Sequence, residues 1–177
     1  MKQYYGQQAA EYAPLPPLFA ARVRFASVVT GVSLVIGTLL VFGLTAFVNR
    51  PLHGHSLPRG PLGLAAWLLP MLSVLAIAVV VLSARRCLQG DYLVIARARS
   101  TRAALTVCFT LLSVSCVIAL GVSALVDLWG NHGRLGFTEL LAAFANFAIG
   151  LIGYSAGLWF VRPSVSTLEK FSDHPIW

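Results

Sequence analysis

Three histidines lie in short connections between long apolar segments, and their chemistry suits a metal ion. His53 and His55 alternate in the first connection, and His132 lies in the third with Asp127 and Glu139 on either side. Imidazole and carboxylate groups are ligands that zinc and copper accept. No further spacing rule supports this set. We therefore expect no bound metal and keep His53, His55 and His132 only as candidate ligands.

Asn146 is the only strongly polar side chain within the apolar segments. It lies about two helical turns into the fourth segment, with Ala142 and Gly150 one turn away on either side. An amide at this depth either forms a hydrogen bond between helices or lines a pore or a quinone headgroup site. One amide without a second polar residue at similar depth makes a poor pathway. We therefore predict a structural role in helix packing.

Other residue types with chemical potential are arranged unfavourably for catalysis. Cys108 and Cys116 are two turns apart in the third apolar segment, and Cys87 precedes that segment. Catalytic dithiols usually have close Cys-x-x-Cys spacing near a surface. The chain also has no phosphate-binding loop, nucleophile elbow or metalloprotease motif. We predict a protein that is not an enzyme and that binds no cofactor.

The apolar segments themselves contain no Asp, Glu, Lys, Arg or His. Carriers coupled to protons or cations usually hold such residues at depth, despite the cost of burying them. A membrane haem would need an axial ligand such as histidine within a span. These absences from the sequence argue against pumps, proton channels and haem proteins.

Four apolar segments must position all of these residues, and they cover residues 25–48, 62–84, 103–126 and 140–161. Each exceeds the roughly 20 residues that a membrane-spanning helix needs. Hydrophobic residues make up 58% of the 177 positions and charged residues 11%, against about 45–50% and 25% in soluble domains. The sequence predicts an all-α membrane protein with four transmembrane helices, packed as a helical bundle or within a larger membrane complex.

The basic residues predict the orientation of these four spans. Of the 13 Lys and Arg residues, only Arg50, Arg59 and Arg134 lie in the first and third connections. The others lie in residues 1–24, 85–102 and 162–177, and such an excess in short connections marks the cytoplasmic side. We predict cytoplasmic N- and C-terminal tails, residues 1–24 and 162–177, in a bacterial inner membrane. The net charge of +7 then reflects topology and predicts no nucleic-acid partner.

Small residues recur at one-turn spacing in the first and fourth segments. They are Ser27, Gly31, Ser33 and Gly37 in the first segment and Gly153 and Gly157 in the fourth. Lipid provides no hydrophobic drive between helices, so small residues that permit close contact are how spans associate. We predict that these positions and Asn146 form helix-packing faces, within the monomer, against other subunits or in a homo-oligomer.

Prolines mark two further features. Pro70 lies inside the second apolar segment and predicts a kink near residues 66–70. Pro14, Pro16 and Pro17 predict an extended, polyproline-like stretch before the first span. That stretch either lies along the lipid headgroups or docks on an aromatic groove of a partner.

The middle connection combines basic and apolar residues. Its arginines are Arg85, Arg86, Arg97, Arg99 and Arg102. Leu88, Tyr92 and Ile95 recur at helical spacing, which predicts that the flanking helices continue beyond the membrane and meet in a turn near Gly90. The resulting surface would contact anionic lipid or an acidic partner, unless it is simply a solvated turn.

We predict a non-catalytic integral membrane subunit, or an assembly factor, of a larger membrane protein complex. The spans offer packing faces and no chemistry at depth, so membrane lipids and other integral membrane subunits are the expected partners. One alternative is a small homo-oligomeric channel or carrier. A second alternative is a quinone- or metal-binding membrane protein that uses Asn146 or the histidines.

Overall fold

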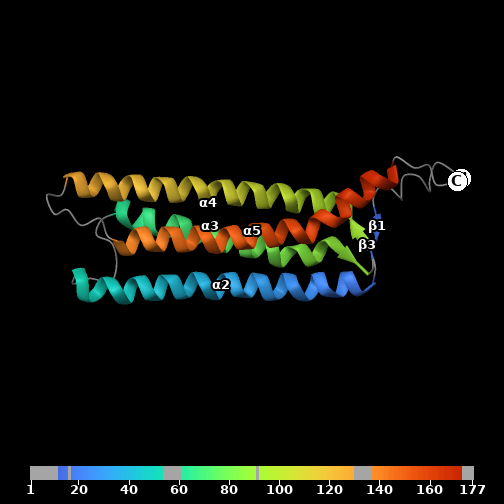
Figure 1. The fold of residues 1–177 in the computed structure, drawn as a ribbon, viewed down its shortest axis with the longest axis horizontal. Coiled ribbons are helices and arrows are strands. Elements are labelled where there is room, and N and C mark those ends of the chain that lie inside the picture. The colour runs from blue at the N-terminus through green and yellow to red at the C-terminus, as the bar shows by residue number, and fades with distance from the viewer. Residues whose placement is uncertain (1–11, 16, 54–60, 91, 130–136, 173–177) are drawn as a thin grey trace, which may run out of the picture.

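Four long helices make up almost all of the described chain (Figure 1). The computed structural model describes residues 12–15, 17–53, 61–90, 92–129 and 137–172. The long helices are α2 (Pro17–His53), α3 (Pro61–Ser83), α4 (Ile95–Trp129) and α5 (Phe137–Ser172). Strand β1 (Tyr12–Pro14) precedes α2, and the 3₁₀ helix η1 (Ala84–Cys87) and strands β2 (Leu88–Gln89) and β3 (Tyr92–Val94) join α3 to α4.

Each long helix contains a segment that is long and apolar enough to cross a membrane. These segments are Ala20–Val48, Leu64–Cys87, Ile95–Val122 and Leu140–Val161. The prediction of four long apolar helices is therefore confirmed, and together they indicate an integral membrane protein. The helices also extend beyond the apolar segments predicted from the sequence; α4, for example, begins at Ile95, whereas the predicted segment begins at Ala103.

The helices run alternately up and down, and the bundle has two inner and two outer members. α3 and α5 pack against each other and against both remaining helices, whereas α2 and α4 lie on opposite sides of this central pair (Figure 1). α3 and α5 consequently run in the same direction. Their shared interface forms the centre of the fold.

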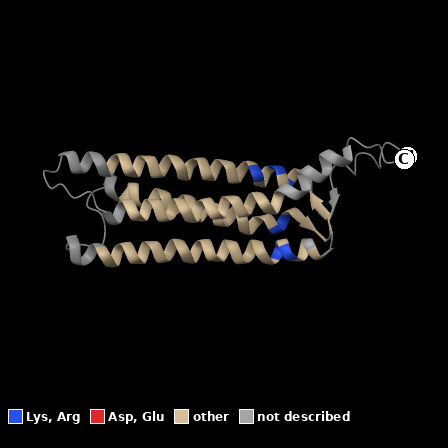
Figure 2. Cartoon of the chain, in the orientation of Figure 1, with Lys and Arg blue, Asp and Glu red and all other residues tan. Residues whose placement is uncertain are grey.

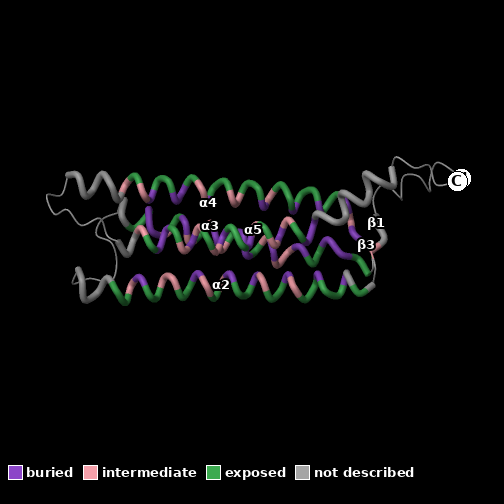
Figure 3. The backbone as a smooth tube through the Cα atoms, viewed as in Figure 1, coloured by how far each residue is buried: buried purple, intermediate pink, exposed green. Residues whose placement is uncertain are grey.

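Many large apolar side chains of the long helices are exposed. On α2 and α4 the buried positions face the other helices and the exposed positions face away from them (Figure 3). Phe25 is 73% exposed and Phe47 75% exposed, while Val74 and Ile77 of α3 are fully buried. A soluble protein seldom exposes apolar patches of this extent. Lipid chains are the environment in which such an outer surface carries no penalty.

Of the prolines before the first span, Pro14 and Pro17 do not form the predicted polyproline-like stretch, and Pro16 lies outside the described residues. Pro17 is the first residue of α2, and Pro14 belongs to β1. Proline suits the first helical position because its fixed φ is already helical and its missing N–H has no partner there in any case. Pro61 begins α3 in the same way, and α3 remains helical through Pro70.

The middle connection agrees with the predicted helical extensions only in part, because α4 extends back to Ile95 whereas α3 ends at Ser83. A turn does occur at Gly90, but β2 and β3 on either side of it pair as a β-hairpin, and β1 pairs with β3. The spacing of Leu88, Tyr92 and Ile95 was misleading because three residues define a helical period poorly. Strand pairing satisfies the backbone of this segment instead.

Candidate functional site

The candidate site is the end of the bundle that carries the hairpin. We name the described residues among 12–24 and 84–102 the hairpin end. Its sheet has the strand order β1-β3-β2, and Leu88 pairs with Leu93 and Gln89 with Tyr92 in antiparallel register. Gly90 follows directly with a φ of 61°. Two-residue hairpin turns demand such a left-handed conformation, which glycine adopts without a steric penalty.

Buried side chains anchor the hairpin to the helices. Cys87, Leu88, Leu93 and Ile95 are all at most 8% exposed. The Cys87 Sγ atom lies 3.2 Å from Thr101 Oγ1 of α4, a buried hydrogen bond in which either atom can donate. The alternation of buried Leu93 with exposed Tyr92 is typical of a strand with one face on a core.

The segment before α2 joins this hairpin as an edge strand. Tyr12 pairs with Val94, Ala13 with Leu93 and Pro14 with Tyr92. An edge strand tolerates Pro14 because its outer side has no ladder to complete. This pairing brings the start of the chain and the middle connection together at one end of the bundle.

Two arginines form hydrogen bonds to backbone carbonyl oxygens within the hairpin end. Arg24 of α2 donates from Nη2 to the carbonyl oxygen of Gly90 at 2.7 Å. Arg97 of α4 donates from Nη1 to the carbonyl oxygen of Arg86 at 3.0 Å. Each guanidinium retains further N–H groups, because the side chain carries five donors in a planar fork.

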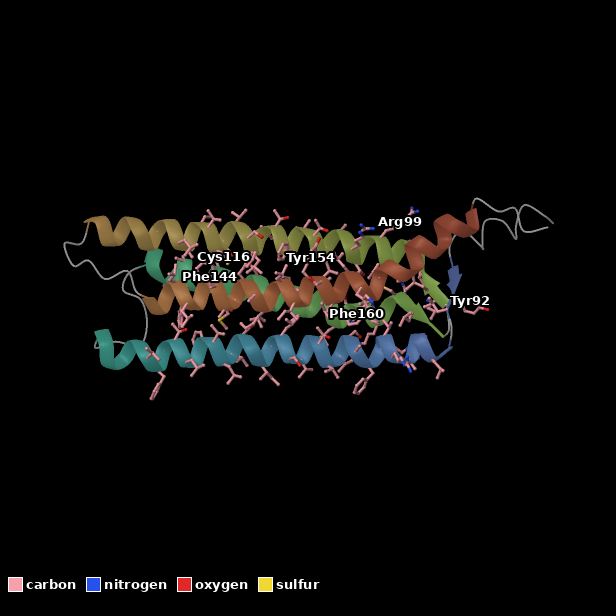
Figure 4. The ribbon with its side chains drawn as sticks, in the orientation of Figure 1. Tyr92, Arg99, Cys116, Phe144, Tyr154 and Phe160 are labelled. Atoms are coloured by element: carbon pink, nitrogen blue, oxygen red, sulfur yellow. The ribbon has the colours of Figure 1, made fainter. Side chains whose placement is uncertain are left out.

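Every Lys or Arg whose side chain the structure describes lies at the hairpin end (Figure 2). These residues are Arg22, Arg24, Arg85, Arg86, Arg97, Arg99 and Arg102, and all are exposed. None of the described side chains is acidic (Figure 2), and Asp91 lies outside the described residues. Arg99 points away from the bundle, and Tyr92 lies at the tip of the hairpin (Figure 4). Exposed guanidinium groups around an apolar body are suited to phosphate or carboxylate groups.

Most of the small residues named from the sequence lie between helices, and side chains of neighbouring helices occupy the space beside them. A methyl group built on Gly31 would meet the Leu82 side chain, and one on Gly37 would approach Ile149 at 3.4 Å. Ser27 is fully buried and donates to the carbonyl oxygen of Arg24 at 3.0 Å.

Leucine side chains from two different helices pack against Gly153 and Gly157 of α5. A methyl group built on Gly153 would lie 2.6 Å from the Leu34 side chain of α2, and one on Gly157 would lie 2.7 Å from Leu105 of α4. Glycine at these positions therefore allows leucine side chains to approach the α5 backbone. This is close packing between the spans of one chain.

Ser33 and Asn146 depart from the simple packing scheme. Ser33 is exposed on the outer side of α2. Asn146 is 5% exposed, so it faces the interior, but its amide oxygen accepts no hydrogen bond from the residues that the structure describes. The interhelical hydrogen bond predicted for the Asn146 amide therefore has no donor to this oxygen among the described residues.

The candidate metal ligands lie mostly beyond the described residues. His55 and His132 are outside them, and of His53 only the backbone is described, as the last residue of α2. Among the described side chains, no group of three or more His, Cys, Asp or Glu residues comes together.

Sequence reasoning missed three features of this chain. The Gly90-Asp91 pair between Leu88-Gln89 and Tyr92-Leu93-Val94 is a recognisable hairpin signal. The hydrogen bond from Arg24 has no sequence signal, because its acceptor is a backbone carbonyl far along the chain. Gly150 also packs tightly, against Leu112, and its spacing from Asn146 and Gly157 on one helix face was the available clue.

Comparison of the chain with protein-family models, with curated proteins and with solved structures finds no match.

Proposed function

We propose that this chain is a non-catalytic subunit, or an assembly factor, of a larger membrane protein complex. The observation that carries the proposal is the contrast between a filled interior and a charged end. Leucines from neighbouring helices occupy the space beside the α5 glycines. The described arginines surround the hairpin, where an anionic headgroup or an acidic partner surface can reach them.

The hairpin end is the cytoplasmic side in this proposal, and the membrane is a bacterial inner membrane. The support is the excess of basic residues in short connections, which are retained on the cytoplasmic side during insertion. A reporter fused after Trp177 that is active in the cytoplasm would agree with this orientation. Activity only on the outer side would contradict it.

Solubilisation from the native membrane in a mild detergent tests the proposed partnership. The chain should be recovered with at least one other integral membrane polypeptide in a fixed ratio. An unrelated membrane protein of similar abundance, carried through the same procedure, controls for mixed micelles. Recovery only as an oligomer of this chain would overturn the proposal in favour of the channel or carrier alternative.

Charge variants test whether the hairpin end contacts the partner or anionic lipid. Replacing Arg99 and Arg102 with Gln removes two exposed charges but retains the bonds that Arg24 and Arg97 make to carbonyls. Recovery of the partner or of anionic lipid should fall, and raised salt should mimic the effect, because exposed charges are screened over about 10 Å at 0.1 M salt. The variant Arg59→Gln removes a charge from the first connection and should leave recovery unchanged.

A further inference from the structure

The interface between α3 and α5 has a regular register that extends to Asn146. A methyl group built on Gly150 would lie 3.5 Å from Val74, one on Gly153 would lie 3.2 Å from Ile77, and one on Gly157 would lie 3.3 Å from Val81. Each pair has the same separation along the chain, as expected for two helices that run in the same direction. One turn beyond Gly150 and Val74, this register places Asn146 opposite Pro70.

Asn146 and Pro70 also lie on the facing sides of α5 and α3. Gly153 lies against α2 and α3, whereas Gly150 lies against α3 and α4. Successive helical residues are turned by about 100°, which places Asn146 between these two glycines around α5 and therefore toward α3. The same rotation places Pro70 between Ile77 and Val81 around α3, on the side that faces α5.

Pro70 leaves a backbone acceptor free at this level. Proline has no N–H, so the carbonyl oxygen of Ala66, four residues earlier, lacks its helical donor. Pro70 is below 2% exposed and Ala66 is 8% exposed, so this part of α3 is buried inside the bundle. Within a membrane, a freed carbonyl must find a donor on a neighbouring helix or on an ordered water molecule.

Asn146 brings a second acceptor that lacks a donor among the described residues. Its amide oxygen is buried and accepts no hydrogen bond there. Three buried hydroxyls on neighbouring helices are already engaged: Thr38, Thr45 and Ser115 donate within their own helices at 2.8, 2.7 and 2.8 Å. The protons of these hydroxyls are therefore committed to the backbone.

We propose that one water molecule is bound between α3 and α5, where it donates to the amide oxygen of Asn146 and to the carbonyl oxygen of Ala66. Water is the smallest molecule with two donors, and ordered waters in proteins occupy sites whose polar groups would otherwise lack partners. The side chains that flank Asn146 one turn before it, Ala142 and Ala143, are short and buried. This water completes the hydrogen bonds that Pro70 interrupts, independently of the partner proposed above.

Solid-state NMR on the full chain in lipid bilayers tests the site directly. Magnetisation that starts on water should reach the Asn146 side chain and the Ala66 carbonyl. Val74 and Ile77, which pack against glycines in the same interface, should receive no magnetisation from water over the same mixing time. A wild-type spectrum in which Asn146 and Ala66 are as dry as Val74 would overturn the proposal.

One variant removes an acceptor, a second supplies the other acceptor with a helical donor, and a third is a matched control. Asn146→Leu should abolish the water signal at Ala66, and Pro70→Ala, which restores the helical N–H, should abolish it at Asn146. Thr38→Val removes a buried hydroxyl whose proton is already used by Leu34, and it should leave both signals in place. Retention of the Ala66 signal in Asn146→Leu, or of the Asn146 signal in Pro70→Ala, would also refute the bridge.

Pro70→Ala protects the test against a folding failure of Asn146→Leu, because alanine is the best helix former. A direct bond from the Asn146 amide N–H to the Ala66 carbonyl is the competing arrangement. It would be recognised by a through-space contact between these two groups together with the absence of water transfer, and it would overturn the proposal.

Discussion

The interior of the bundle and its hairpin end are held together by different interactions. In the interior, Gly150, Gly153 and Gly157 accept side chains from α2, α3 and α4. At the hairpin end, guanidinium groups donate to carbonyl oxygens and strands pair. Lipid chains are as apolar as leucine, so fit decides how spans associate. At the end of the bundle, directional hydrogen bonds position the connection.

Adding volume to the interior should destabilise the protein more than any change at the hairpin end. In Gly150→Ala the new methyl group would meet the Leu112 side chain, and overpacking of this kind typically costs about 1–3 kcal/mol. Unfolding in detergent, followed by circular dichroism, should show the loss across the whole bundle. Gly43→Ala is the matched control, because a methyl group built on Gly43 meets nothing within 4 Å among the described residues.

A second substitution tests whether Leu112 is the cause. Leu112→Ala should restore part of the stability that Gly150→Ala removes, although by itself it leaves a cavity and destabilises the protein. Equal losses from Gly150→Ala and Gly43→Ala would refute the account of close packing.

A change of backbone conformation at the hairpin should have an intermediate and local effect. Gly90 has a φ of 61°, and an L residue such as alanine in that region costs about 1–2 kcal/mol. Hydrogen exchange of the hairpin amides should accelerate by roughly tenfold in Gly90→Ala, since about 1.4 kcal/mol corresponds to a factor of ten. Exchange in the middle of α3 should not change.

Asparagine provides the control at this position, because it tolerates the left-handed region better than alanine. Gly90→Asn should accelerate exchange less than Gly90→Ala. The reverse order would show that the conformation of Gly90 does not stabilise the hairpin.

Loss of a single directional bond at the hairpin end should have the smallest effect. Arg24→Gln removes the 2.7 Å bond to the Gly90 carbonyl, and because the bond is exposed we expect a cost of about 1 kcal/mol or less. The change should appear as faster exchange in the hairpin without a change in the thermal midpoint of the bundle. Arg22→Gln removes the same charge nearby and retains the bond. Indistinguishable exchange in the two variants would mean that the bond contributes nothing.

The sequence predicted the helices of the interior well and the hairpin end poorly. Long apolar segments predict helices strongly because every unpaired backbone group in lipid must be satisfied within its own segment. The middle connection has no such constraint, so three residues at helical spacing were outweighed by Gly90-Asp91 and by the pairing of β3 with β1. Ser33 shows the limit for packing faces, since its spacing from Gly37 is right but its side chain is exposed.

Local composition along the chain was enough to predict four long apolar helices and a concentration of arginines in the N-terminal tail and the middle connection. The packing of the helices was needed to see which leucine lies against which glycine and that β1 pairs with the hairpin. The physical reason is that apolar length and charge are properties of single segments. Contact between segments depends on their rotation and register, which neighbours far along the chain determine.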